Sequence, residues 1–140
     1  MHKLWLLSVA LGVLGTTAYA GGGEATTIPG NIYRLKSSIT LPGKAPSWDY
    51  LSFDAKRHHL FIARRDAGLW VLDTHTNHVV RKVADTEGAG GTILVSALDR
   101  GFVIREDGTL IVINLATLAP VKQIKFAEDA DSGSYDPVTG

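Results

Sequence analysis

The sequence predicts an all-β protein, and three observations support this prediction. Beyond residue 20, short runs rich in Val, Ile, Leu and aromatic residues alternate with clusters of Gly, Asp, Asn and Thr. No stretch of this region keeps a helical period for three turns. The pattern also recurs along the chain at a fixed spacing. We expect a leading strand near Ile32–Leu41 and then strands at Tyr50–Phe53, Leu60–Ala63, Leu69–Leu72, Val79–Val83, Ile93–Val95, Phe102–Ile104, Leu110–Ile113 and Val121–Phe126.

The repeat has a spacing of 41 residues and needs no gap. Apolar residues and turn residues both match between the two copies. The identical pairs are Phe61 and Phe102, Arg64 and Arg105, Asp66 and Asp107, Leu69 and Leu110, Val71 and Val112, Thr76 and Thr117, and Val80 and Val121. A second shift places Ser52-Phe53-Asp54 on Ser134-Tyr135-Asp136. The chain therefore holds two copies and the start of a third, near Asp131.

A unit of about 40 residues with four short strands is typical of one β-propeller blade, a small sheet that buries its faces against its neighbours. A β-sandwich is the alternative, but it does not explain why turn residues match as well as apolar ones. We expect four-stranded antiparallel blades at about 46–87 and 88–128, and a third that begins within 129–140. Closure takes about four to eight blades, so we expect an incomplete ring.

The composition excludes several kinds of site. The 140 residues include 14 basic and 14 acidic side chains and no cysteine. Disulfides, thiolate metal sites and cysteine nucleophiles are therefore excluded. The zero net charge provides no general attraction to nucleic acid or to an anionic membrane. The sequence also contains no motif for covalent haem, a serine-hydrolase elbow, a phosphate loop or a zinc-protease helix, and we expect no cofactor.

The N-terminus has the layout of a secretory signal peptide. His2 and Lys3 precede an apolar run from Leu4 to Gly15, and Ala18-Tyr19-Ala20 supplies small residues at the cleavage spacing. A membrane anchor is the alternative, but the run is shorter than the roughly 20 residues that a spanning helix needs. We expect cleavage after Ala20, a flexible leader at 21–30, and a periplasmic or secreted protein without a membrane anchor.

The repeat units resemble the YVTN, or YncE-like, family of periplasmic β-propellers, whose repeats are WD40-like. The segments that carry the resemblance are 48–83, its copy 98–124, and the closing 134–140. Thr76-Asn77-His78 stands where Thr-Gly-Lys is common in the family, and Asn77 can still adopt the left-handed turn conformation. The resemblance implies export, a ring of about seven blades and, usually, no catalysis. It also implies that the leading strand is the outer strand of the closing blade.

Blade topology predicts a ligand-binding face. The second-to-third strand turns and the links between blades lie on one face, which carries five candidate residues: Trp48, Asp49, Arg64, Arg65 and Arg105. Because Arg64 and Arg105 recur at one repeat position, a closed ring would repeat a guanidinium suited to carboxylate or phosphate. The alternative is structural: each arginine braces its own hairpin through Asp66 or Asp107, and Trp48 and Asp49 serve packing and turn capping.

The opposite face carries His58, His59, His75 and His78 in two turns of one blade. Neutral imidazoles bind zinc, copper or nickel, so these histidines are weak candidates for a metal site. Their positions in the second copy hold other residue types. Solvated turn histidines are therefore the preferred interpretation, and no metal is expected.

The sequence favours a non-catalytic scaffold that binds an unknown protein or a small anionic ligand. A fragment of a propeller enzyme is the alternative: a lactonase-like hydrolase or lyase, or a quinone- or haem-linked redox protein, whose site lies partly on other blades. Unpaired strands at blade edges invite self-association. We therefore expect the isolated chain to be oligomeric or poorly soluble.

Overall fold

The computed structural model describes residues 33–44, 47–125 and 128–139. The chain divides into two units, residues 1–37 and 38–140. In the first unit the described residues, 33–37, are exposed and form neither helix nor strand. The predicted signal peptide and the leader at 21–30 lie outside the described residues. All further description concerns the second unit.

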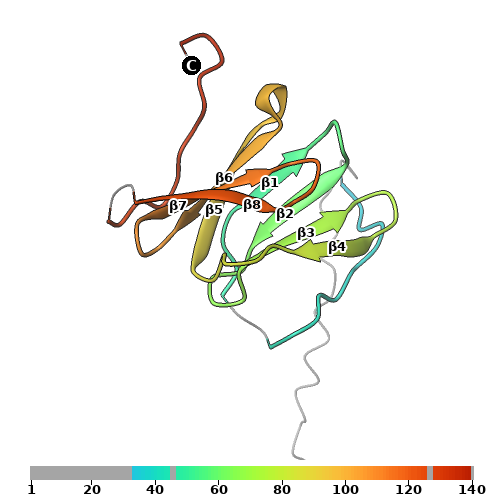
Figure 1. The fold of residues 1–140 in the computed structure, drawn as a ribbon. Helices are drawn as coiled ribbons and strands as arrows, with labels where there is room; N and C mark the ends of the chain where they lie inside the picture. The colour runs from blue at the N-terminus through green and yellow to red at the C-terminus, as the bar shows by residue number, and fades with distance from the viewer. Residues whose placement is uncertain (1–32, 45–46, 126–127, 140) are drawn as a thin grey trace, which may run out of the picture. The chain divides into compact units, whose positions relative to one another are not determined.

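The first sheet contains β1 (Leu51–Asp54), β2 (His59–Ala63), β3 (Leu69–Asp73) and β4 (His78–Lys82). The strands are antiparallel and follow each other in chain order, as Figure 1 shows. This is the order predicted for one blade. We call this sheet blade 1.

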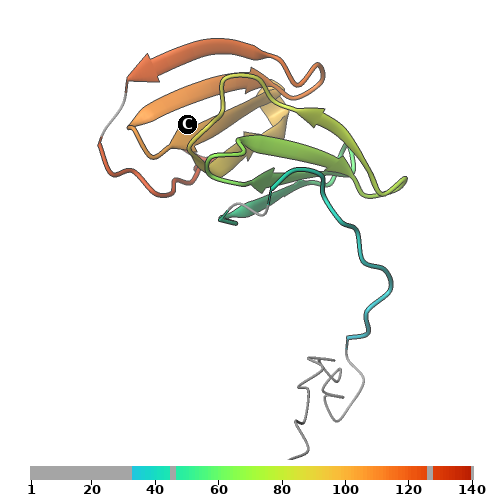
Figure 2. The same ribbon diagram turned by 90° about the horizontal axis from the view of Figure 1, so that it is seen from below.

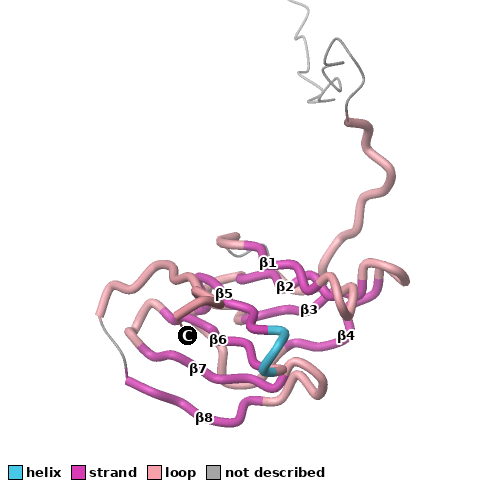
Figure 3. The backbone as a smooth tube through the Cα atoms, turned by 90° about the horizontal axis from the view of Figure 1, so that it is seen from above, coloured by secondary structure: helices cyan, strands magenta, loops and turns pink. Residues whose placement is uncertain are grey.

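Blade 2 repeats the arrangement with β5 (Ala89–Val95), β6 (Arg100–Arg105), β7 (Thr109–Asn114) and β8 (Pro120–Lys125). A single turn of 3-10 helix, η1 (Ser96–Leu98), joins β5 to β6 (Figure 3). Both sheets carry a register shift between the third and fourth strands, at Val71/Leu72 and at Val112/Ile113, one repeat apart. The all-β fold with two antiparallel four-stranded blades is confirmed.

The turns form where short polar side chains can bind the backbone. Asp73 Oδ1 accepts from the N–H of His75 at 2.7 Å and of Thr76 at 3.1 Å, which closes the β3–β4 turn. Asn114 makes the same bonds in the β7–β8 turn. Asn77 has a φ of 60°, as expected for a residue that replaces glycine in this turn.

The two sheets pack against each other (Figures 1 and 2). Alternate residues of β2 and β3, which point to one side of blade 1, share a core with residues of β6, β7 and the turn after β7 in blade 2. The side chains of this core are fully or almost fully buried. They are Phe61, Ala63, Leu69, Val71, Val83, Ala89, Val103, Ile111, Ile113, Leu115 and Leu118.

Most strand boundaries lie within two residues of the predicted ones, and two regions differ more. β5 begins at Ala89, whereas the sequence predicted Ile93, because Gly90 and Gly91 resembled a turn. Gly91 pairs with Ile104 in the β5–β6 ladder, whereas Gly90 lies at a bulge between Ala89 and Gly91 and accepts a hydrogen bond from the N–H of Tyr50 at 3.1 Å. The leading strand is also corrected: residues 33–41 form no strand, since no described segment pairs with them.

The start of the third copy reproduces a turn but not a strand. Residues 131–136 have no ladder partner, yet Asp136 Oδ1 accepts from the N–H of Val138 at 2.9 Å. Asp54 Oδ1 accepts from the N–H of Lys56 at 3.0 Å in the same way. The repeat therefore continues into residues 134–139.

Candidate functional site

The loops that the topology assigned to one face are joined by backbone hydrogen bonds. Arg65 N–H donates to the carbonyl of Ala89 at 3.2 Å, and Gly88 N–H donates to the carbonyl of Arg65 at 2.9 Å. Glu106 N–H then donates to Gly88 O at 3.0 Å. The β2–β3, β4–β5 and β6–β7 loops thus form one continuous surface across both blades. We call it the arginine face, defined by Asp49, Arg64, Arg65, Asp66, Glu87, Arg105, Glu106 and Asp107.

Arg65 lies between carboxylates of both blades. Its Nε is 2.6 Å from Asp49 Oδ2, and its Nη1 is 3.5 Å from Glu106 Oε2. The backbone at Arg65 is left-handed, with a φ of 44°, and the Ala89 and Gly88 bonds hold it there. Its charge is already compensated within the protein.

Arg105 is also compensated, within its own hairpin. Its Nε donates to the carbonyl of Glu87 at 2.7 Å, and its Nη2 is 3.2 Å from Asp107 Oδ2. The Glu87 carboxylate faces Lys82, whose ammonium donates to it at 2.9 Å and holds the pKa of Glu87 below its ordinary value. This part of the surface matches the structural alternative, in which arginine braces the turn.

Arg64 does not match that alternative. It is 2% exposed, and its guanidinium carbon lies 4.8 Å from the ring centroid of Trp70 and 5.2 Å from that of Trp48. Its Nη1 donates to the carbonyl of Pro42 at 3.0 Å, and its Nη2 to that of Lys44 at 3.5 Å. In the described ranges, no carboxylate lies within ion-pair distance of Arg64, Asp66 included.

Trp48 and Asp49 mark the beginning of β1. Trp48 is 58% exposed and Tyr50 is 55% exposed. Asp49 N–H donates to the carbonyl of Ala63 at 3.0 Å, which positions the Asp49 carboxylate beside Arg65. The structure therefore brings all five candidate ligand residues to one region, with Arg105 at its blade 2 margin.

The sequence interpretation missed three contributors to this region. The ring of Trp70 contacts Arg64, and its indole N–H donates to the carbonyl of Ala67 at 2.9 Å. The carbonyls of Pro42 and Lys44 come from a segment without regular structure, which no pattern indicated. The sequence does place Arg64 and Trp70 on either side of one hairpin turn, and this placement was the signal that could have indicated their contact.

The four histidines lie on the opposite face, as predicted. The rings of His58 and His75 are stacked, with centroids 4.1 Å apart and an angle of 16° between planes. Because imidazole lone pairs lie in the ring plane, stacked rings do not converge on one ion. Over residues 33–44, 47–125 and 128–139, no three His, Cys, Asp or Glu side chains are placed to share a metal ion.

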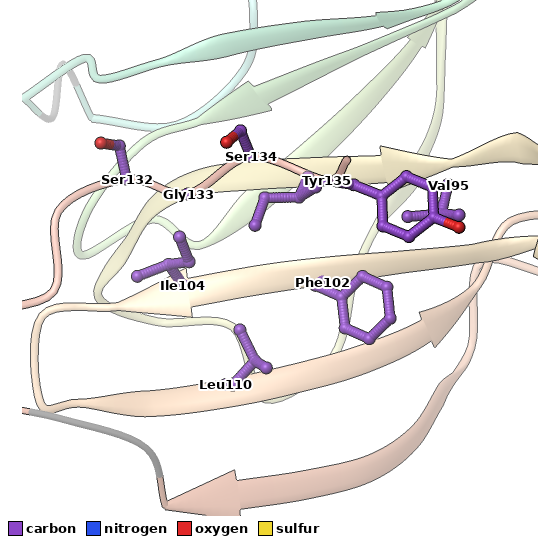
Figure 4. Close-up of a pocket in the computed structure, with 9 residues that line it drawn as sticks. Val95, Phe102, Ile104, Leu110, Ser132, Gly133, Ser134 and Tyr135 are labelled. Atoms are coloured by element: carbon purple, nitrogen blue, oxygen red, sulfur yellow. The ribbon is translucent and has the colours of Figure 1, made fainter. Parts of the chain in front are cut away.

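An apolar pocket of about 260 Å³ lies on the outer side of blade 2. Phe102, Ile104 and Leu110 line it from the sheet, and Ser132–Tyr135 lie alongside β5 at its border (Figure 4). The corresponding side of blade 1, at Phe61 and Leu69, is filled by blade 2. The pocket thus occupies the position of a blade-to-blade contact.

Comparison with solved structures finds β-propellers. The chain is similar to the hydrazine synthase of Kuenenia stuttgartiensis, with a TM-score of 0.62 and 14% identity over 76% of this chain and 30% of that one. It is also similar to the β-propeller domain of Cps50 (Swd1) from Myceliophteria thermophila, with a TM-score of 0.52 and 17% identity over 64% of this chain and 29% of that one.

No family model and no curated protein matches the sequence. The described residues include no helix long and apolar enough to span a membrane. The chain spans less than a third of the length of either similar structure. At these identities the comparisons show the fold, which is that of two β-propeller blades.

Proposed function

We propose that the protein is a non-catalytic β-propeller scaffold that binds a partner protein or a small ligand on its arginine face. One observation carries the proposal: backbone hydrogen bonds and the Asp49–Arg65–Glu106 ion pairs hold loops of both blades in one surface. Rigid loops on a stable framework are a common basis for binding sites. The exposed Trp48 and Tyr50 at the margin are residue types enriched in interfaces.

We further propose that the protein is exported and belongs with the YVTN-type propellers. The apolar run at 4–15 with Ala18-Tyr19-Ala20 supports export, and the 41-residue repeat supports the family. N-terminal sequencing of the protein recovered from the periplasm or medium tests the first part. We expect Gly21 as the first residue, and an intact N-terminus in the cytoplasmic fraction would overturn export.

Binding can be tested by thermal-shift measurements on the full chain with acetate, citrate, phosphate and sulfate, followed by titration of any anion that raises the melting temperature. The Arg65→Ala/Arg105→Ala variant should reduce the response. Arg100→Ala is the matched control, because Arg100 lies on the opposite face beside Asp99. An equal response in all three proteins would show that Arg65 and Arg105 are not the binding site on this face.

The enzyme alternative has a separate readout. Turnover of a lactone panel, or a visible chromophore in the purified protein, would replace the scaffold proposal with a hydrolase or redox protein. The scaffold proposal expects neither result.

A further inference from the structure

Arg64 is the arginine of this face that has no carboxylate partner among the described residues. A guanidinium has five N–H donors, and the described contacts of Arg64 use two of them, at 3.0 and 3.5 Å. Its Nε is buried and has no hydrogen-bond partner in the part of the chain that the structure describes. Arg65 and Arg105, by contrast, each bind at least one carboxylate. Arg64 is thus a buried cation whose acceptors are only neutral carbonyls.

Burial of a charge is costly unless an opposite charge or several strong acceptors compensate it. The Trp48 and Trp70 rings provide part of the compensation through cation–π contact. They contact the guanidinium but accept no N–H in its plane. A planar carboxylate could accept two parallel N–H bonds there, and such bonds are roughly twice as strong as neutral ones.

The cover over Arg64 is short and irregular. Residues 42–44 form a bend outside any strand, and Gly43 has a φ of +93° with no heavy atom within 4 Å of where its Cβ would be. The hydrogen bonds from Arg64 to this segment end on main-chain carbonyls. Displacing the segment would therefore cost neutral hydrogen bonds and no ion pair.

We propose that Arg64, flanked by Trp48 and Trp70, is a carboxylate-binding site that residues 42–44 cover in the unliganded protein. The carboxylate accepts from the Nε–H and from Nη2, where it replaces the carbonyl of Lys44. This inference rests on the proposed scaffold function and names the ligand class and the residue that binds it. Because Trp48 is half-exposed, a carboxylate on an aromatic or apolar body is the best fit.

The test uses ¹⁵N-labelled full chain and benzoate as the probe, with benzamide as its uncharged match. The Nε–H cross-peak of Arg64, assigned by its loss in Arg64→Lys, should shift with benzoate and not with benzamide. Arg64→Lys should weaken benzoate binding at least about tenfold, since lysine keeps the charge but not the bidentate geometry. Arg105→Lys should change it less than about twofold, because Asp107 occupies Arg105.

The Gly43→Ala variant tests whether residues 42–44 cover the site. Because it keeps Arg64, its result does not depend on whether an Arg64 variant folds. Alanine has space at this position but is strained at a φ of +93°. If the covered state competes with the ligand, the substitution should tighten benzoate binding by about fivefold. Unchanged affinity in Gly43→Ala would overturn the cover.

The remaining outcomes separate this inference from the scaffold proposal. Benzoate binding that is unaffected by Arg64→Lys but lost in Arg65→Ala/Arg105→Ala would overturn the Arg64 site and support the arginine face. Binding of phosphate but not benzoate at the Arg64 Nε–H would overturn the ligand class. No shift of that cross-peak with benzoate up to 50-fold molar excess or with any anion of the panel would overturn the site itself.

Discussion

Blades 1 and 2 place the same residue type at the same repeat position in opposite environments. Arg64 directly follows β2 and is buried against two tryptophans, while Arg105 ends β6 and is half-buried beside Asp107. The neighbours account for the difference, because Trp48 corresponds to Ala89 and Trp70 to Ile111. Only blade 1 thus has aromatic rings that can hold a guanidinium. A repeat preserves backbone and turns, whereas the function of a repeated side chain depends on residues that are not repeated.

The largest expected effect on stability is the difference between two single variants, Arg64→Ala and Arg105→Ala. Arg64→Ala should lower the free energy of unfolding by about 3 kcal/mol, since it empties a buried space, removes two cation–π contacts and leaves two carbonyls without donors. Arg105→Ala should cost less than a third of that, because its ion pair is half-exposed. Urea unfolding measures both, and equal losses would contradict the comparison.

A second contrast involves Asp54 and Asp136, which occupy the same turn position in the first and third copies. Asp54 is 2% exposed and accepts from Arg57 Nη1 at 2.7 Å, while Arg57 also pairs with Asp99 of blade 2. Asp54→Ala should cost about 2 kcal/mol, as expected for a charged hydrogen bond that joins two blades. Asp136→Ala, in the exposed third copy, should leave the urea midpoint unchanged. A comparable loss in both variants would show that residues 131–139 are as well packed as blade 1.

The sequence was sufficient to predict the blades because apolar residues and turn residues recur at one spacing in both sheets. The turns were also predictable, since Asp73 and Asn114 are residue types that bind the backbone two and three positions ahead. The start of β5 was not predictable. Gly90 lies at a bulge and accepts a hydrogen bond from Tyr50 of the other blade, and such tertiary contacts leave no periodic signal.

The candidate site was predictable as a surface but not as a set of contacts. Topology alone brought Asp49, Arg65 and Arg105 to one face. The structural alternative paired Arg64 with Asp66, the nearest carboxylate in its own hairpin. The structure instead gives Arg64 two tryptophans and the carbonyls of Pro42 and Lys44. Contacts with an irregular segment depend on its path in space, which neither hydrophobic periodicity nor residue type encodes.

A smaller difference concerns the position that is Leu60 in blade 1 and Gly101 in blade 2. A Cβ at Gly101 would lie 2.8 Å from Ile113 Cγ1 and 3.0 Å from Leu115 Cδ2, in the core between the blades. Gly101→Ala should therefore destabilise the protein by about 1–2 kcal/mol through overpacking. Leu60→Ala, on the outer side of blade 1, should cost about 1 kcal/mol through lost burial. A stabilised Gly101→Ala variant would show that the two sheets are less tightly packed than the structure indicates.

The smallest effect is a difference in acid sensitivity between two equivalent turns. The N–H groups of Thr76 and His75, with the charges of His59 and His75, hold the pKa of Asp73 below the ordinary value of 3.8. Its stabilising contribution is therefore fully present above the pKa of the unfolded chain and is lost as the pH falls through the lower pKa of the folded state. Asn114 makes the same turn bonds without titrating.

Two single variants, Asp73→Asn and Asn114→Asp, isolate the contribution of the turn carboxylate, because all other carboxylates are the same in every variant. Melting temperatures at pH 7 and pH 3 should differ less in Asp73→Asn than in the wild type, and more in Asn114→Asp, if each substitution preserves its turn. Amide shifts of Thr76 and Thr117 report on the turns directly: on acidification below pH 5 the first should move in the wild type, and the second only in Asn114→Asp. Equal acid sensitivity of all three proteins would mean that the charge at this position adds nothing to what a neutral side-chain oxygen provides. In that case aspartate and asparagine would stabilise this turn equally, and the two blades would differ at their arginines but not here.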